Sequence, residues 1–455
     1  MNQILWNKIE TFEFDQPPSE YGFTTRLACE NYWTNEFTAQ AILEYRKFMY
    51  LAATSDFMVS PSEIVDVVWH QHLIFTQSYQ SFCSILQKQV QHIPSTHNRE
   101  DFDKFRLAKE RTSFLYEKEF GAQPKNIWGF KDIFESLNLQ KARFKIRTFI
   151  IFGIIGWMLL SIPAYFVLRP LYVQIDNPYF ITCFIPLAAI IILSLDYFNK
   201  RQLCKIVAGF DPTCFIYSLQ PYELVYLKTQ KLFHVINGTV NELIELELVR
   251  INADYSLSLQ RNYATTDTFH WQVSTTLSDM GSTHYPQLIQ KLEAKPIFWI
   301  IPNTLDAFRK YFNKSKKFGM LFYINFSALM ILLLLSFTRV VTGTLREKPV
   351  LQIFLLTIML GLITVQFLMR LTRQVSTIII PNIYKEDILS KHQVENIWAW
   401  EYFLMGSEVL SPYFVPLVNY VTKNNSSGGD GSSCGSSCGS SCGSSCSSCG
   451  GCGGG

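Results

Sequence analysis

Four long uncharged stretches dominate the pattern of hydrophobic and polar positions along the chain. They cover residues 148–168, 177–195, 318–338 and 349–369, and each runs for 19 to 21 residues without Asp, Glu, Lys or Arg. A helix of about 20 mainly apolar residues crosses the hydrocarbon core of a bilayer, whereas buried core helices are usually shorter and interrupted by polar positions. The pattern predicts four transmembrane helices in two pairs (148–196 and 318–369), with the lipid bilayer as a partner.

The residues before the first uncharged stretch have the periodicity of a soluble helical domain. Within 34–53, apolar side chains recur every three or four residues, which is typical of an amphipathic helix. The Ser60-Pro61 pair predicts the start of a second helix, which should continue to about residue 82. A third helix is expected over about 98–120. We therefore expect residues 1–147 to form a helical domain, and the fold class to be mainly α.

A second soluble domain, residues 197–317, is expected between the two pairs of membrane helices. A helix should begin near Pro221, and a second helical pattern covers 233–248 with an interruption near Asn237-Gly238. Residues 249–260 predict two short strands. Helix, helix and hairpin follow one another as in winged-helix modules, so we expect a small α+β, winged-helix-like domain.

Charge indicates what this second domain binds. Winged-helix modules bind DNA or other proteins, and DNA binding needs a basic surface. The chain carries a formal net charge of only +3, and its segment 205–300 holds nine acidic and seven basic residues. Such a segment would repel phosphate. We therefore expect a protein partner and no nucleic acid.

Lys and Arg are distributed unequally between the two sides of the predicted bundle. Fourteen lie at the membrane ends that adjoin 1–147, 197–317 and 370–423, and four lie in the loops 169–176 and 339–348. The richer side is normally cytoplasmic. The first thirty residues show no signal-peptide pattern, so the N-terminus is expected to stay in the cytoplasm. Together with the charge distribution, this predicts a multi-pass protein of a bacterial cytoplasmic (inner) membrane with both termini in the cytoplasm.

The segment 370–423 is rich in aromatic residues but too often charged to span a membrane. Its longest uncharged run covers only 14 residues, 409–422. Trp and Tyr gather at membrane–water interfaces, where their rings lie at the headgroup level. The composition therefore predicts an interfacial element with an aromatic belt.

Residues 424–455 form a Gly/Ser-rich tail of low complexity, which we expect to be disordered. Thiols recur in it at nearly every fourth position, and a reducing cytoplasm would keep them free of structural disulfides. Thiolates bind soft metals such as Zn or Cu(I). The tail therefore predicts soft-metal or redox handling, or a scaffold, with six candidate ligands: Cys434, Cys438, Cys442, Cys446, Cys449 and Cys452.

Three alternatives to metal or redox handling stay open for this cysteine repeat. The tail can be the substrate of a cysteine-modifying enzyme, with the membrane-bound body as its carrier. Cysteines close to a membrane can also be acylated. Finally, replication slippage can generate such a repeat without any function.

The string from Asp66 to His72 concentrates histidine in a protein with only eight. On a helix, His70 and His72 point about 200° apart and cannot share an ion, whereas Asp66 and His70 lie on one face. His92 and His97 follow in a later loop. We therefore name Asp66, His70 and His92 as candidate ligands of a metal-dependent enzyme, with structural histidines as the alternative.

Recognisable catalytic motifs are absent from the sequence. It contains no Walker loop, Rossmann glycine fingerprint, HExxH or GxSxG string. The four uncharged stretches also lack histidine, although proton and ion pathways usually need ionisable groups inside the bilayer. The sequence thus favours a non-enzymatic protein over an enzyme, and disfavours an ion pump.

Residues from about 36 to 130 resemble the glycine-rich domain-containing proteins of plants and bacteria. The resemblance rests on the string VDVVWHQH with the following Tyr79, and on VQHIPS and FLYEKEFGAQPKNIW. Residues 205–260 resemble a second domain of uncharacterised bacterial membrane proteins that have Gly- and Cys-rich C-termini. Both resemblances imply an architecture and no catalytic residue.

Overall fold

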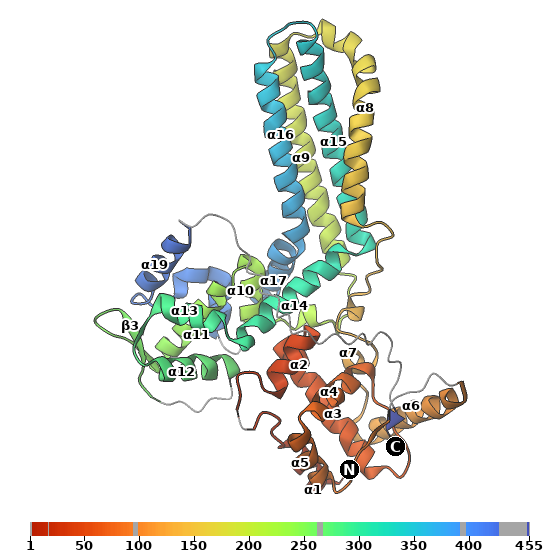
Figure 1. Cartoon of the computed structure of the whole chain (residues 1–455), viewed down its shortest axis with the longest axis vertical. Coiled ribbons are helices and arrows are strands. Elements are labelled where there is room, and N and C mark those ends of the chain that lie inside the picture. Colours follow the sequence, from red (N-terminus) through yellow and green to blue (C-terminus); the bar gives the residue numbers. More distant parts are fainter. Residues whose placement is uncertain are drawn as a thin grey trace. The chain divides into compact units, whose positions relative to one another are not determined.

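The chain divides into two compact units, which we describe separately (Figure 1). The computed structural model describes residues 2–16, 18–93, 99–261, 267–391, 397–426 and 453–454. The soluble unit comprises residues 1–136, 212–305 and 391–455, and the membrane unit comprises residues 137–211 and 306–390. Both are mainly helical, as the sequence predicts.

The N-terminal part of the soluble unit is helical and has a single short strand among its described residues. Its elements are α1 (Gln3–Glu10), α2 (Phe23–Asn31), α3 (Asn35–Thr54), α4 (Glu63–Ile74), α5 (Thr76–Leu86), β1 (His92–Ile93), α6 (Arg99–Phe120), α7 (Lys125–Trp128) and the 3₁₀ turn η1 (Glu135–Leu137).

Helix α3 forms the centre of this part, packing against α4, α6, α1 and α2. The side chain of Thr34 accepts a hydrogen bond from the amide of Phe37 and so caps the helix. The predicted second helix is divided: α4 is capped by Ser62 instead of Ser60, and the chain breaks at Phe75 before α5 begins. Because of this break, α5 is a separate helix that packs against α4.

The remaining part of the soluble unit combines helices with a small antiparallel sheet of order β2-β3-β4. Its elements are η2 (Phe215–Tyr217), α10 (Pro221–Thr229), α11 (Leu232–Glu245), β2 (Val249–Ile251), β3 (Ser256–Leu259), α12 (Thr268–Met280), β4 (Thr283–His284) and α13 (Tyr285–Glu293), followed after the membrane unit by α18 (Ile397–Met405), η4 (Gly406–Val409) and α19 (Val415–Ser426). Helix α14 (Pro296–Asn313) begins in this unit and ends in the other.

The predicted helix, helix and hairpin are all present. Pro221 is the first residue of α10, and Gln220 and Glu223 form a reciprocal capping box at its start. Strands β2 and β3 pair in register, with Arg250 opposite Ser258. Helix α11 runs through the expected interruption at Asn237-Gly238, because both residues are buried on its packed face.

The aromatic segment 370–423, predicted as an interfacial element, divides between the two units. Its first part extends the last membrane helix, and α18 and α19 belong to the soluble unit. There Tyr402, Phe403 and Phe414 are buried against neighbouring helices such as α10 and α13. These rings serve as core residues, because α10, α11 and α13 offer an apolar surface that α18 and α19 cover.

The membrane unit contains four long helices that run side by side (Figure 1). They are α8 (Ile146–Gln174), α9 (Asn177–Val207), α15 (Lys316–Thr344) and α16 (Leu351–Gln374), the last continuing through a π-helical turn (Val375–Ile379) into α17 (Ile380–Lys391). Each is long and apolar enough to cross a membrane, as expected for a multi-pass membrane protein. Helix α15 packs on the other three, while α8 exposes Phe152, Leu159 and Val167.

Two of the predicted loops are shorter than the sequence suggests. Helix α8 continues to Gln174 and α15 to Thr344, so Arg339 lies inside a helix instead of a loop. Its guanidinium is buried and donates to the backbone carbonyls of Tyr172 and Ile175 at the end of α8, the latter at 2.6 Å. The arginine thereby satisfies carbonyls that the end of α8 leaves without helical partners.

Candidate metal centre

Helix α4 presents two different faces, and its sequence dictates both. Asp66 and His70 are four residues apart and lie on one face, where the His70 side chain is 48% exposed. His72 points about 200° away from His70 and is fully buried, as is Trp69, which lies between the two directions. His72 contacts the hydroxyl of Tyr45 through Nδ1 at 2.9 Å. His70 and His72 thus have different partners, Asp66 for His70 and Tyr45 for His72.

Strand β1 brings a third candidate ligand to the outer face of α4. Nε2 of His92 lies 3.1 Å from Oδ1 of Asp66, and Nδ1 of His70 lies 3.2 Å from Oδ2 of the same carboxylate. The imidazole rings of His70 and His92 are 4.3 Å apart between centroids. One ligand atom from each residue lies within 4.8 Å of the others. The three predicted ligands therefore meet at one place, although 26 residues separate Asp66 from His92.

The electrostatics of this cluster favour a charged carboxylate. Partial burial of Asp66 opposes its ionisation, but hydrogen bonds from His70 and His92 outweigh that effect and lower its pKa to about 2. The hydrogen bond between Asp66 and His70 raises the pKa of His70, although partial burial of this imidazole lowers it. The carboxylate thus remains an anionic acceptor through the physiological pH range.

Neighbouring acidic and histidine residues do not all join the cluster. Glu63, one turn before Asp66, lies 3.5 Å from the ammonium of Lys109 on α6. His97, which the sequence offered as a further ligand, lies outside the described residues, and so do the six tail cysteines, Cys434, Cys438, Cys442, Cys446, Cys449 and Cys452. Gly453–Gly454 is described as a short strand, β5, which pairs with β1 and places Gly454 opposite His92.

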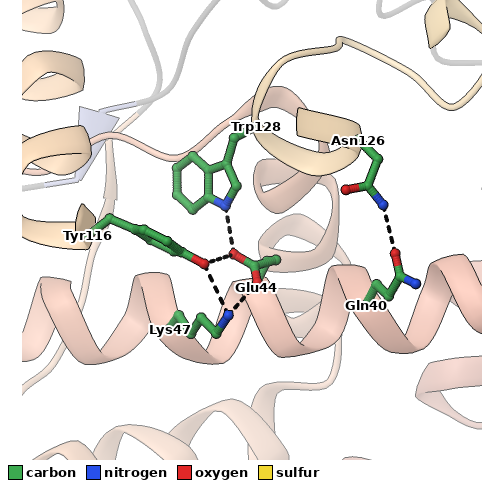
Figure 2. A network of polar contacts seen from close by, with 6 residues as sticks. All are labelled: Gln40, Glu44, Lys47, Tyr116, Asn126 and Trp128. Carbon is green, nitrogen blue, oxygen red and sulfur yellow. Dashed lines mark hydrogen bonds and ion pairs between the residues drawn. The ribbon is translucent and has the colours of Figure 1, made fainter. Parts of the chain in front are cut away.

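A second buried carboxylate in the same helical domain has a different environment (Figure 2). Glu44 on α3 is 3% exposed. One of its oxygens accepts hydrogen bonds from the hydroxyl of Tyr116 and the indole of Trp128, each at 2.7 Å, and the other lies 2.7 Å from the ammonium of Lys47. Nearby, the amide of Asn126 donates to Gln40 (Figure 2). Glu44 thus has its own donors and no solvent-facing side, so it serves the fold.

The sequence analysis missed this network, although a signal was present. Glu44 falls on the apolar stripe of its helix, three residues after Ala41 and four before Phe48. A carboxylate at such a position must be buried and needs dedicated donors. Its donors Tyr116 and Trp128, however, lie far along the chain, and no local pattern identifies them.

The comparison with known protein families gives a match over the region that holds the cluster. A family model described as UCP032817-like matches residues 9–106, which include all three candidate ligands. No curated protein and no solved structure is significantly similar to the chain. The match therefore concerns the N-terminal part of the soluble unit.

Proposed function

We propose that this membrane protein handles a transition-metal ion, bound by Asp66, His70 and His92. The observation that carries the proposal is their convergence, with ligand atoms within 4.8 Å of one another. A tetrahedral ion with bonds of about 2.1 Å separates its ligand atoms by about 3.4 Å. The measured 3.1 and 3.2 Å between carboxylate and imidazoles are close to that spacing, so small side-chain rotations suffice.

The chemistry of the donors favours zinc or a similar ion. Two imidazole nitrogens and one carboxylate oxygen suit borderline ions such as Zn²⁺ and Co²⁺. Three protein ligands leave a tetrahedral ion one further position, which a closed structural site does not have. The half-exposed His70 leaves that position accessible to solvent. Such a site exchanges its ion or admits an external ligand more readily than a closed one.

The tail fits the same proposal as a second set of soft-metal ligands. Its six cysteines, Cys434, Cys438, Cys442, Cys446, Cys449 and Cys452, can bind Zn or Cu(I) as thiolates. Gly454, which follows these cysteines in the sequence, pairs opposite His92. We propose that the tail and the cluster lie in the bacterial cytoplasm, which the distribution of Lys and Arg supports.

The second part of the soluble unit is proposed to be winged-helix-like and to bind a protein. The order of α10, α11 and the β2–β3 hairpin supports this, and the acidic balance of 205–300 disfavours nucleic acid. The proposed kinship of the N-terminal part with glycine-rich domain-containing proteins rests on the VDVVWHQH string, which contains two of the candidate ligands.

Titration of the full-length protein with Co²⁺ and Zn²⁺ in detergent tests the proposal. We expect one ion to bind independently of residues 424–455, with further ions lost when that segment is deleted. The double variant His70→Ala/His92→Ala should lose more than the roughly 10- to 100-fold in affinity that a supporting residue costs, because it removes two ligands. The matched control is His284→Ala, since His284 is exposed on β4.

Two results would reject the proposal. If the tail-deleted protein binds neither ion, Asp66, His70 and His92 form only a hydrogen-bonded structural cluster. If the double variant binds as well as the His284→Ala control, the ion resides elsewhere.

A further inference from the structure

We infer that Tyr79 and Trp69 are positioning residues that hold His92 in place for the ion. The inference rests on the proposed metal site and explains why a buried Tyr and Trp accompany its ligands. Neither side chain belongs to the candidate ligand set. Tyr79 acts on the backbone of the segment that carries His92, and Trp69 contacts the imidazole ring of His92.

A chain of hydrogen bonds connects the buried side of α4 to the segment that carries His92. The indole nitrogen of Trp69 donates a hydrogen bond of 3.1 Å to the hydroxyl of Tyr79 on α5. That hydroxyl in turn donates to the backbone carbonyl of Val90, two residues before His92. All three residues are buried, with Trp69 fully inaccessible.

Trp69 also contacts the ligand itself. Its ring meets the imidazole of His92 edge to face, with centroids 4.7 Å apart. The neighbouring residue on α4 is His70, a ligand. His70 is thus a proposed ligand of the ion, while the preceding residue, Trp69, supports the ring of His92 on β1.

The division of α4 and α5 makes this arrangement possible. A continuous helix would carry Tyr79 away from Trp69, whereas the break at Phe75 brings the two rings to the same buried face. The hydroxyl then links α4, α5 and the segment before β1 in a single chain of hydrogen bonds. Lys88 ties the start of that segment to the end of α3, donating to the carbonyls of Ala52 and Ser55 at 2.9 Å each.

Removing the hydroxyl should therefore affect the ion without touching a ligand. In Tyr79→Phe, the indole of Trp69 and the carbonyl of Val90 both lose their buried partner. The segment that carries His92 then loses its anchor to α4. Changes of groups that orient metal-binding histidines typically cost about 10- to 100-fold in affinity, and we expect a loss of this size for Co²⁺.

Tyr116→Phe is the matched control. Tyr116 is another buried tyrosine of the same domain, and its hydroxyl donates to Glu44 instead of the segment near the site (Figure 2). Both substitutions remove one buried hydroxyl, so both should lower the melting temperature. Only Tyr79→Phe should change the Co²⁺ affinity and the visible d–d spectrum, which reports the ligand geometry and does not respond to stability alone.

The experiment uses the full-length protein in detergent with Co²⁺ as the probe. If Tyr79→Phe binds Co²⁺ within about threefold of the wild type with an unchanged spectrum, far from the loss typical of orienting groups, the inference is overturned. An equal loss in Tyr116→Phe would overturn it as well. Failure of the wild type to bind Co²⁺ would instead refute the metal site itself.

A second variant covers the case in which Tyr79→Phe does not fold. Trp69→Phe keeps an aromatic ring beside His92 and the bond from Tyr79 to Val90, but it removes the indole donor. We expect a loss of about tenfold in Co²⁺ affinity, at the lower end for such supporting groups. An affinity and spectrum identical to those of the wild type would contradict the inference.

Discussion

In the soluble unit, the carboxylates of Glu44 and Asp66 meet charged and neutral side-chain donors, whereas in the membrane unit Arg339 meets backbone carbonyls and a side-chain amide. Glu44 is paired with Lys47, Tyr116 and Trp128, and Asp66 with two imidazoles. In the membrane unit, Arg339 donates to the carbonyls that end α8 and to the side-chain amide oxygen of Asn177. The charge of the buried Arg339 is thus satisfied by neutral acceptors.

The two sets of polar groups differ in role, because one joins helices and the other supplies candidate metal ligands. The polar groups of the membrane unit named so far fasten one helix to another. Asn199 of α9 and Asn325 of α15 do the same, exchanging amide hydrogen bonds of 2.8 and 2.7 Å. Within the described part of the chain, the Asp66 cluster is the only group of three His, Cys, Asp or Glu residues whose ligand atoms lie close enough to hold one ion, and its His70 is half-exposed. In the described residues, the polar groups of the membrane unit thus join helices, whereas the soluble unit holds the candidate metal ligands.

The strongest test of this comparison is Arg339→Leu. The substitution leaves the carbonyls of Tyr172 and Ile175 and the side chain of Asn177 without their charged donor. Losing the partner of buried groups bonded to a charge costs on the order of 4 kcal/mol, and we expect that loss in detergent unfolding measurements. Arg346→Ala, which removes a single 3.5 Å contact to Val173, is the control. Similar losses in both variants would show that Arg339 does not fasten α8.

A smaller effect is expected from the pH dependence of the soluble unit. Burial raises the pKa of Glu223 to about 7, against a hydrogen bond from Gln220 that lowers it. The carboxyl binds its proton more tightly when folded, so its contribution to stability is complete below about pH 4.5 and is lost as the pH rises through 7. At pH 8 this costs on the order of 3 kcal/mol.

Glu223→Gln should remove that cost while keeping an oxygen for the amide of Gln220. We expect the variant to unfold at higher temperature than the wild type at pH 8, and the two melting temperatures to converge near pH 4. Calorimetry over this range measures the difference. A gap that stays constant with pH would contradict the raised pKa.

The smallest expected effect concerns the asparagine pair of the membrane unit. Asn199→Leu leaves Asn325 without its reciprocal partner and should cost about 1 kcal/mol, since hydrogen bonds between membrane helices are weak. The double variant Asn199→Leu/Asn325→Leu should recover most of that loss, because no amide stays unpaired. Unfolding of the four proteins of this cycle gives the coupling energy. Additive losses would show that the pair does not act as a unit.

Much of the molecule follows from local patterns in the chain. The uncharged stretch 318–338 predicts a membrane helix, which the structure extends by two residues at its start and six at its end. The i, i+4 spacing places Asp66 and His70 on one helix face. The hairpin over 249–260 also follows from a local pattern. Hydrophobic period and helical spacing determine these features within a few residues, so distant contacts are not needed to foresee them.

The sequence by itself determined which stretches suit lipid, which faces are apolar and which ligand types lie near one another along α4. Only the tertiary structure decided that β1 brings His92 to that face, that Tyr79 turns back to Trp69, and that the rings of α18 join a soluble core. The physical reason is that partners distant in the chain are chosen by packing and by the need of buried polar groups for a donor or acceptor. A local pattern shows that such a need exists, and the fold selects the residue that meets it.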